Sequence, residues 1–226
     1  GARTTIGYVY SPCLRFEGGY FGTYSWEDNA IATNLVANSQ GGLGNLNTIL
    51  SGFANAAGLS GNDQVTLSQF SAFNSEEANA RYWLDVPPGP FDVSLTLGFR
   101  HLSARESLTF ASQAGAGNIA GSDVNNALTV NTANDLWGGQ IGFQVAWLQS
   151  AHTWLEADVK GMMFHNNASQ ASLYTRSDAG APFPTFREQE RTAWGGDIVL
   201  AYNIQFTPGL VLRLGYQAIF VNGLAL

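Results

Sequence analysis

The chain has 226 residues, of which only 12% are charged, and its formal net charge is −7. Soluble globular proteins carry about 25% charged residues, so the chain is unusually poor in ions for a water-soluble domain. It contains no basic run, which argues against a nucleic-acid partner. It also contains no stretch of about 18 consecutive apolar residues, so a membrane-spanning helix is excluded.

Cysteine and histidine offer little material for a metal or redox site. The single cysteine, Cys13, follows a Ser-Pro pair in what we interpret as a tight turn, and it cannot form an intrachain disulfide. His152 lies in a short turn and His165 near a strand end, so the two are not expected to share a metal ion. We therefore predict no metal and no cofactor.

Apolar and polar residues alternate along most of the chain. This period of two residues is the one expected for β-strands. In the clearest strand, residues 91–102, Leu95 and Leu97 share one face while Thr96 and Arg100 share the other. The other strong strands are 137–147, 197–206 and 210–221, and the weaker ones are 4–10, 14–24, 79–86 and 154–164. The better strands have ten residues or more, enough for a tilted membrane strand of about 9–11 residues.

The connections between these strands are alternately short and long. The short ones are residues 11–13, 87–90, 149–153 and 207–209, and the long ones are about 27–74, 103–130 and 166–191. Outer-membrane barrels have short periplasmic turns and long outer loops. We therefore predict an all-β fold, a transmembrane antiparallel up-and-down β-barrel, as a single domain over residues 1–226.

The order of the connections also predicts where the strands begin and end. Because the first connection is short, the first strand should run toward the periplasm and the eighth should finish on the outer side. Barrels of this type normally begin and end in the periplasm, so we expect at least one further strand at each end and ten or more in all. A complete eight-stranded chain with both termini outside is the alternative.

Apolar residues in the first long connection recur at helical spacing. They are Leu43, Leu46, Ile49, Leu50, Phe53 and Ala57. This pattern predicts a short amphipathic helix, which either packs on its own loop or acts as a plug in the barrel mouth.

The polar face of each strand lines the lumen if the apolar face meets lipid. The charged residues assigned to the lumen by this criterion are Arg15, Glu17, Arg81, Asp85, Asp92, Arg100, Glu156, Asp158, Lys160, Asp197 and Arg213. Five are positive and six are negative, so the lumen should be nearly balanced in charge. These residues either form structural ion pairs inside the wall or select solutes.

Aromatic residues lie near the strand ends or along the predicted outer face. They are Tyr8, Tyr10, Tyr20, Tyr82, Trp137, Trp147, Tyr202 and Tyr216. Such residues would form the aromatic girdles found at both membrane interfaces of outer-membrane barrels. In a soluble barrel the same residues would instead belong to the core.

Three segments resemble the beta-barrel porin seven family. Residues 212–226, LRLGYQAIFVNGLAL, resemble its signature near the C-terminus, and NDLWGGQIG at 134–142 resembles its N-x-L-x-G-x-Q-x-G strand. Residues 8–13 and 17–22 resemble its early hairpin. The resemblance touches most strands but not the long connections. It implies an outer-membrane location, a porin-like fold, and further sequence on both sides of this chain.

One group of residues suggests catalysis. His101, Ser103 and Glu106 are of the types found in hydrolytic triads. However, His101 and Ser103 share a strand face that points outward by the alternation, and no oxyanion element is apparent. We therefore expect no enzymatic activity.

The leading hypothesis is a porin-like barrel in the outer membrane of a Gram-negative bacterium, which passes or gates small polar solutes. Its partners would be the lipid bilayer and, in addition, further copies of the chain or neighbouring envelope proteins. The main alternative is a structural cell-envelope barrel without transport activity. A membrane-embedded hydrolase and a soluble, lipocalin-like ligand carrier are two further alternatives.

Overall fold

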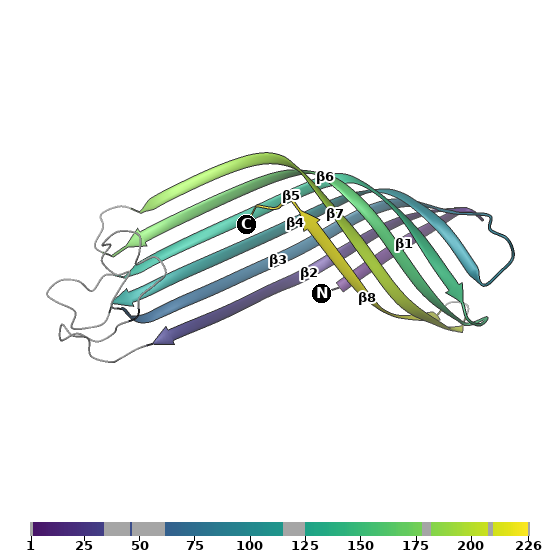
Figure 1. Ribbon diagram of the computed structural model, residues 1–226, viewed down its shortest axis with the longest axis horizontal. Helices are drawn as coiled ribbons and strands as arrows, with labels where there is room; N and C mark the ends of the chain where they lie inside the picture. The colour runs from purple at the N-terminus through teal and green to yellow at the C-terminus, as the bar shows by residue number, and fades with distance from the viewer. Residues whose placement is uncertain are drawn as a thin grey trace.

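The computed structural model describes residues 2–33, 46, 62–114, 125–177, 182–207 and 210–225. Within them lie eight strands: β1 (Ala2–Ser11), β2 (Leu14–Thr33), β3 (Asn62–Trp83), β4 (Phe91–Ala114), β5 (Asn126–Leu148), β6 (Thr153–Arg176), β7 (Phe183–Thr207) and β8 (Leu210–Asn222). Each strand pairs with the next along the chain, and every pair is antiparallel. The all-β, up-and-down antiparallel fold is therefore confirmed (Figure 1).

The predicted closure into a barrel is not observed. In the described residues the sheet runs from β1 to β8 without a ladder between these two strands, so both are edge strands. The edges approach each other through side chains instead, because Arg3 of β1 donates a hydrogen bond of 2.9 Å to Gln217 of β8. The sheet is thus strongly curled but open.

The strands are much longer than the alternation predicted. Strands β2 to β7 have between 20 and 25 residues, and they continue into all three segments predicted as long connections. Those segments are rich in Ser, Thr, Asn and Ala, so their two faces differ little in polarity and the sequence resembles a loop. Cross-strand contacts such as Thr109 with Thr129, whose hydroxyls lie 3.3 Å apart, support the pairing there.

The helix predicted over residues 43–57 lies outside the described residues except at Leu46. Leu46 forms an isolated antiparallel bridge with Asn62.

The curled sheet has two parts along the strand direction. Figure 1 shows all eight strands together at the end with the short turns, on the right, while β2 to β7 continue alone to the left. Strands β1 and β8 have only 10 and 13 residues and belong only to the part with the short turns. We call this part the eight-stranded half. The features described below lie in this eight-stranded half.

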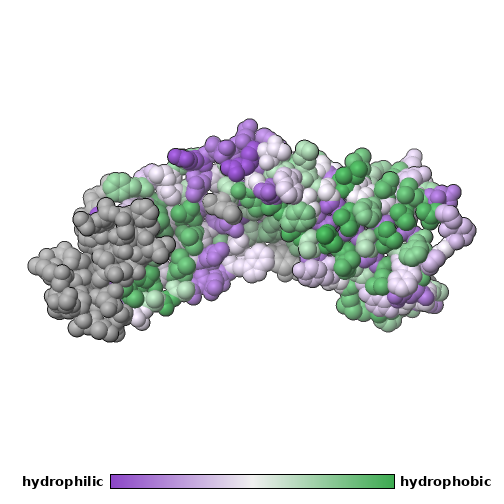
Figure 2. All heavy atoms as spheres, viewed as in Figure 1, coloured by the Kyte–Doolittle hydropathy of each residue, from purple (hydrophilic) through white to green (hydrophobic). Residues whose placement is uncertain are grey.

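The outer face of the eight-stranded half is apolar. Leu97, Ile141 and Met163 are each 67% exposed there. Figure 2 shows apolar side chains gathered over this half, which lies on the right. We call this surface the outer apolar band. It consists of the outward-facing residues of the strands, from the short turns up to one row of paired residues that forms its border. That row is Thr4, Tyr20, Glu76, His101, Trp137, His165 and Thr192.

This row, the outer polar row, crosses seven strands in register and is where polar groups first appear on the outer face. On the side toward the short turns, no outward residue of the described strands is charged. The concave face has the opposite character, since Arg81, Arg100 and Asp197 are among its buried residues. The polarity of the two faces is therefore inverted relative to a soluble sheet with a buried apolar face.

Close packing of β7 on β8 requires a glycine on the concave face. A Cβ atom added at Gly215 would lie 2.6 Å from the carbonyl oxygen of Leu200 and 3.0 Å from the Cβ of Ala201. Gly161 on β6 points outward and has no such neighbour within 4 Å.

We predict that Gly215→Ala lowers the free energy of unfolding by about 1–3 kcal/mol, because the added methyl group overpacks the strand pair. The matched variant Gly161→Ala should change it by less than about 0.5 kcal/mol. Urea unfolding of both variants in detergent measures this difference. Equal effects at the two sites would contradict the packing described here.

Candidate functional site

A cavity of about 970 Å³ lies on the concave face of the eight-stranded half, with residues of all eight strands in its lining. Trp83, Leu148 and Trp154 place it at the end with the short turns. The charged residues that line it are Arg3, Arg15, Arg81, Lys160 and Arg213, and Glu17, Glu77, Asp92, Glu156 and Asp158. Positive and negative groups are therefore equal in number around the cavity.

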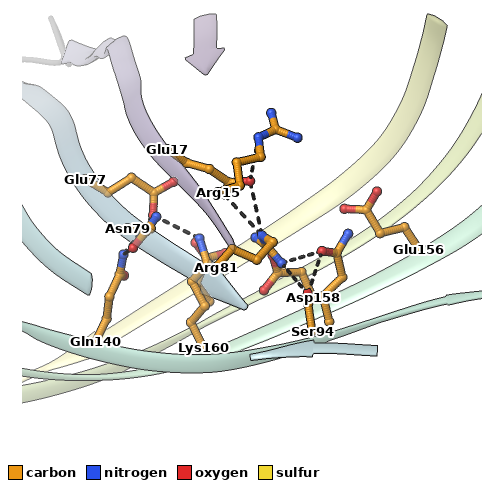
Figure 3. A network of polar contacts seen from close by, with 12 residues as sticks. Arg15, Glu17, Glu77, Asn79, Arg81, Ser94, Gln140, Glu156, Asp158 and Lys160 are labelled. Carbon is orange, nitrogen blue, oxygen red and sulfur yellow. Dashed lines mark hydrogen bonds and ion pairs between the residues drawn. The ribbon is translucent and has the colours of Figure 1, made fainter. Parts of the chain in front are cut away.

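Arg81 on β3 connects the acidic groups of two distant strands. Its guanidinium lies 3.2 Å from Glu17 Oε1 on β2 and 2.9 Å from Asp158 Oδ2 on β6. It also donates hydrogen bonds to Ser94 and Gln144 (Figure 3). Because the side chain of Arg81 is buried, these contacts replace the water that a buried guanidinium requires.

Glu77 on β3 receives a second group of donors. Lys160 Nζ lies 2.9 Å from Glu77 Oε2, and Gln140 donates to the same oxygen at 3.0 Å. Arg3 reaches the other carboxylate oxygen at 3.0 Å. Glu77 therefore links the edge strand β1 to β5 and β6.

The most deeply buried ion pair lies next to the cavity. Arg100 on β4 and Asp197 on β7 are 2.9 Å apart, and both side chains are 1% exposed. Arg100 also donates to Ser75, and Gln217 of β8 donates to Asp197. Four strands, β3, β4, β7 and β8, are thus joined by one polar layer across the concave face.

An apolar cluster follows this layer on the side away from the short turns. It consists of Leu102, Leu136, Met162, Phe164 and Ala193, all buried. Ile219, Val221 and Leu224 pack against it. We call these eight residues the apolar layer.

The segment after β8 is fixed over this part of the concave face. Asn134 donates to the carbonyl of Ala225 at 3.0 Å and accepts from the Ala225 amide at 2.7 Å. Asn166 donates to the carbonyl of Gly223 at 2.9 Å. Gly223 has a φ of 90°, which favours glycine and allows the chain to turn inward from the strand.

Most charged residues assigned to the lumen from sequence lie together on the concave face. Those found in ion pairs there are Arg15, Glu17, Arg81, Arg100, Glu156, Asp158, Lys160, Asp197 and Arg213. Asp92 lines the cavity and is exposed. Asp85 is different, because β3 ends at Trp83 and Asp85 is exposed in the connection to β4, away from the cavity lining.

Sequence reasoning missed Arg3 and Glu77. Arg3 precedes the first predicted strand, and Glu77 precedes the strand predicted from residue 79. The alternation of Glu77, Asn79 and Arg81 on one face was the available signal for Glu77.

The aromatic residues assigned to interfaces all lie on strands of the eight-stranded half. Tyr20 and Trp137 belong to the outer polar row. Tyr10, Tyr82 and Trp147 lie beside the short turns. Tyr8, Tyr202 and Tyr216 lie between these two levels.

His101 belongs to a cluster on the outer polar row. Its ring stacks on Trp137 with a centroid distance of 3.9 Å, and its Nε2 lies 2.6 Å from Asp135 Oδ1. Its Nδ1 lies 3.5 Å from Glu76 Oε2. Both ring nitrogens therefore face carboxylates, so neither is positioned to activate Ser103.

Among the described residues, no group of three or more His, Cys, Asp or Glu side chains could hold a metal ion. Cys13 is an exposed free thiol. No helix in the described part of the chain is long and apolar enough to cross a membrane.

Comparison of the chain with models of protein families, with curated proteins and with solved structures gives no match. The resemblance to the beta-barrel porin seven family stays a prediction.

The contribution of the Arg100–Asp197 pair to the free energy of unfolding can be tested. Asp197→Ala leaves Arg100 buried without its partner, so we expect the free energy of unfolding to fall by about 3–5 kcal/mol. The double variant Arg100→Met, Asp197→Ala should recover part of this loss. Arg15→Met, at a half-exposed pair, should cost less than about 1 kcal/mol. A double-mutant cycle with no coupling would contradict the pairing.

Proposed function

We propose that this chain forms the wall of an outer-membrane β-barrel that passes or gates small polar solutes through a charge-lined lumen. The observation that carries the proposal is the opposite polarity of the two faces. Exposing apolar surface to water costs about 25 cal/mol per Å², whereas the same surface is favourable against lipid. A wall with this polarity is suited to a bilayer outside and water inside.

The height of the outer apolar band supports a membrane location. Ten residue steps separate Phe91, at the short turns, from His101 of the outer polar row. At about 3.3 Å per residue this is about 33 Å along the strand. A strand tilt of about 40° reduces the height to about 25 Å, which is the height of the apolar band on outer-membrane barrels.

The borders of the band support the same location. Tyr20, Trp137, Glu76 and His101 would meet the lipid head groups on one side. Tyr10, Tyr82 and Trp147 would form the second aromatic girdle. Insertion also requires both sheet edges to be paired, either with each other or with strands of a longer sheet, because lipid offers no hydrogen bonds.

The apolar layer favours a gated lumen over a permanently open one. The charged cavity lies toward the short turns, and the apolar layer with residues Gly223–Ala225 lies next to it on the side away from these turns. A solute would enter the charged cavity from the short-turn side. Its passage would then require the segment held by Asn134 and Asn166 to move.

A structural barrel without transport is the second candidate. The observation that favours it is the complete burial of Arg100 and Asp197, since small barrels fill their interior with side chains.

Planar-bilayer recordings distinguish the two candidates. We expect conductance steps from the wild-type protein, and a ratio of open to closed time at least about tenfold higher in the double variant Asn134→Ala, Asn166→Ala. That variant loses three hydrogen bonds to the segment after β8, each worth about 0.5–1.5 kcal/mol. Asn167→Ala, at the exposed neighbouring position, should behave as wild type. Inserted protein that never conducts, in any of these variants, would contradict transport and favour the structural barrel.

A further inference from the structure

The cavity is balanced in formal charge but not in accessible charge. The side chains of Glu77, Glu156 and Asp158 are each only 8% exposed, and that of Glu17 is 11% exposed. Three cations of the same lining are far more accessible. Arg3 is 31% exposed, Arg15 38% and Arg213 49%.

The remaining cations are buried with the carboxylates. Arg81 is 6% exposed and Lys160 is 2% exposed, and both are occupied by their acidic partners. Among the carboxylates that line the cavity, Asp92 alone is exposed. Three accessible cations against one accessible carboxylate leave the accessible surface of the cavity positive.

Arg15 and Arg213 also keep free hydrogen-bond donors, whereas Arg3 already donates through Nη1 to Gln217 and through Nη2 to Glu77. A guanidinium has five N–H groups. In the described part of the chain, Arg213 donates a hydrogen bond of 2.7 Å from Nη2 to Glu156. Arg15 approaches Glu17 only through Nε, at 3.4 Å, among the described residues. Figure 3 shows the end of the Arg15 side chain directed away from the pairs around Arg81.

The three arginines lie at or beside the two edges of the curled sheet. Arg3 lies on β1 and Arg15 on β2, while Arg213 lies on β8 at the opposite edge. The hydrogen bond from Arg3 to Gln217 brings these edges together on the concave side. All three side chains line the same cavity.

We propose that this cavity binds small oxyanions, carboxylates or phosphate, through Arg3, Arg15 and Arg213. The planar fork of a guanidinium matches the two oxygens of a carboxylate or phosphate group. The proposal rests on the proposed function only in taking the cavity as the lumen of the barrel. It means that the lumen accepts anions although the chain as a whole carries a net charge of −7.

Arginine modification by phenylglyoxal tests the site without requiring transport. The folded protein in detergent is treated with the reagent, with and without inorganic phosphate, and the rate at each arginine is followed by mass spectrometry. Arg15 and Arg213 should react readily, and phosphate at twice its dissociation constant should slow them about threefold, by the factor 1 + [L]/Kd. Arg81 and Arg100 should stay unmodified.

Internal controls and variants complete the test. Arg105 and Arg187 are exposed and lie outside the cavity lining, so phosphate should leave their rates unchanged. Arg213→Gln should weaken the protection of Arg15, whereas Arg187→Gln should preserve it. If Arg213→Gln fails to fold, the protection by phosphate measured at Arg213 in the wild-type protein still tests the anion site.

The outcomes separate this proposal from the proposed function. Protection confined to the cavity arginines supports the anion site even if the protein never conducts in bilayers. Equal slowing at Arg105 and Arg187, or no slowing at Arg15 and Arg213, overturns the anion site even if the protein does conduct.

Discussion

Compensation of buried charge on the concave face is the constraint on which the rest of the structure depends. A buried arginine without partners would cost several kcal/mol, so each one fixes the positions of the carboxylates around it. Arg81 joins β2, β3 and β6, while Arg100 joins β3, β4 and β7. These contacts hold non-neighbouring strands of the curled sheet together. They also leave the apolar side chains on the outside, where water is an unfavourable neighbour.

The interior is ordered in layers along the strand direction. Arg15 and Arg213 face the cavity near the short turns, buried ion pairs lie behind them, and the apolar layer with the segment after β8 follows. The outer face has its own boundary at the outer polar row. Charge inside and apolar side chains outside therefore occupy the same length of β3 to β8, which is the property that a membrane wall requires.

The sequence predicted the strands where large apolar side chains alternate with charged ones. Residues 91–102 and 210–221 are such cases, and their outward and inward faces could be assigned directly. Beyond the outer polar row, small polar residues occupy both faces, for example Ser107 on the outer face and Thr132 on the concave face, so the alternation disappears although the strands continue. Partner choice could not be predicted either, because the pairing of Arg81 with Asp158 depends on the register of four strands. Closure was predicted from analogy with known barrels. In the described part of the structure β1 and β8 are joined by the side-chain hydrogen bond between Arg3 and Gln217 and not by a backbone ladder.

Spin labels along one strand in lipid vesicles test the central claim most directly. Single cysteines at Leu95, Thr96 and Leu97, introduced in a Cys13→Ser background, would be labelled after insertion. Collisions with oxygen, which dissolves in lipid, are compared with collisions with a water-soluble nickel chelate. The account predicts high oxygen accessibility at positions 95 and 97 and low accessibility at position 96. Higher nickel than oxygen accessibility at 95 and 97 would mean that the apolar band faces water, and it would contradict the account.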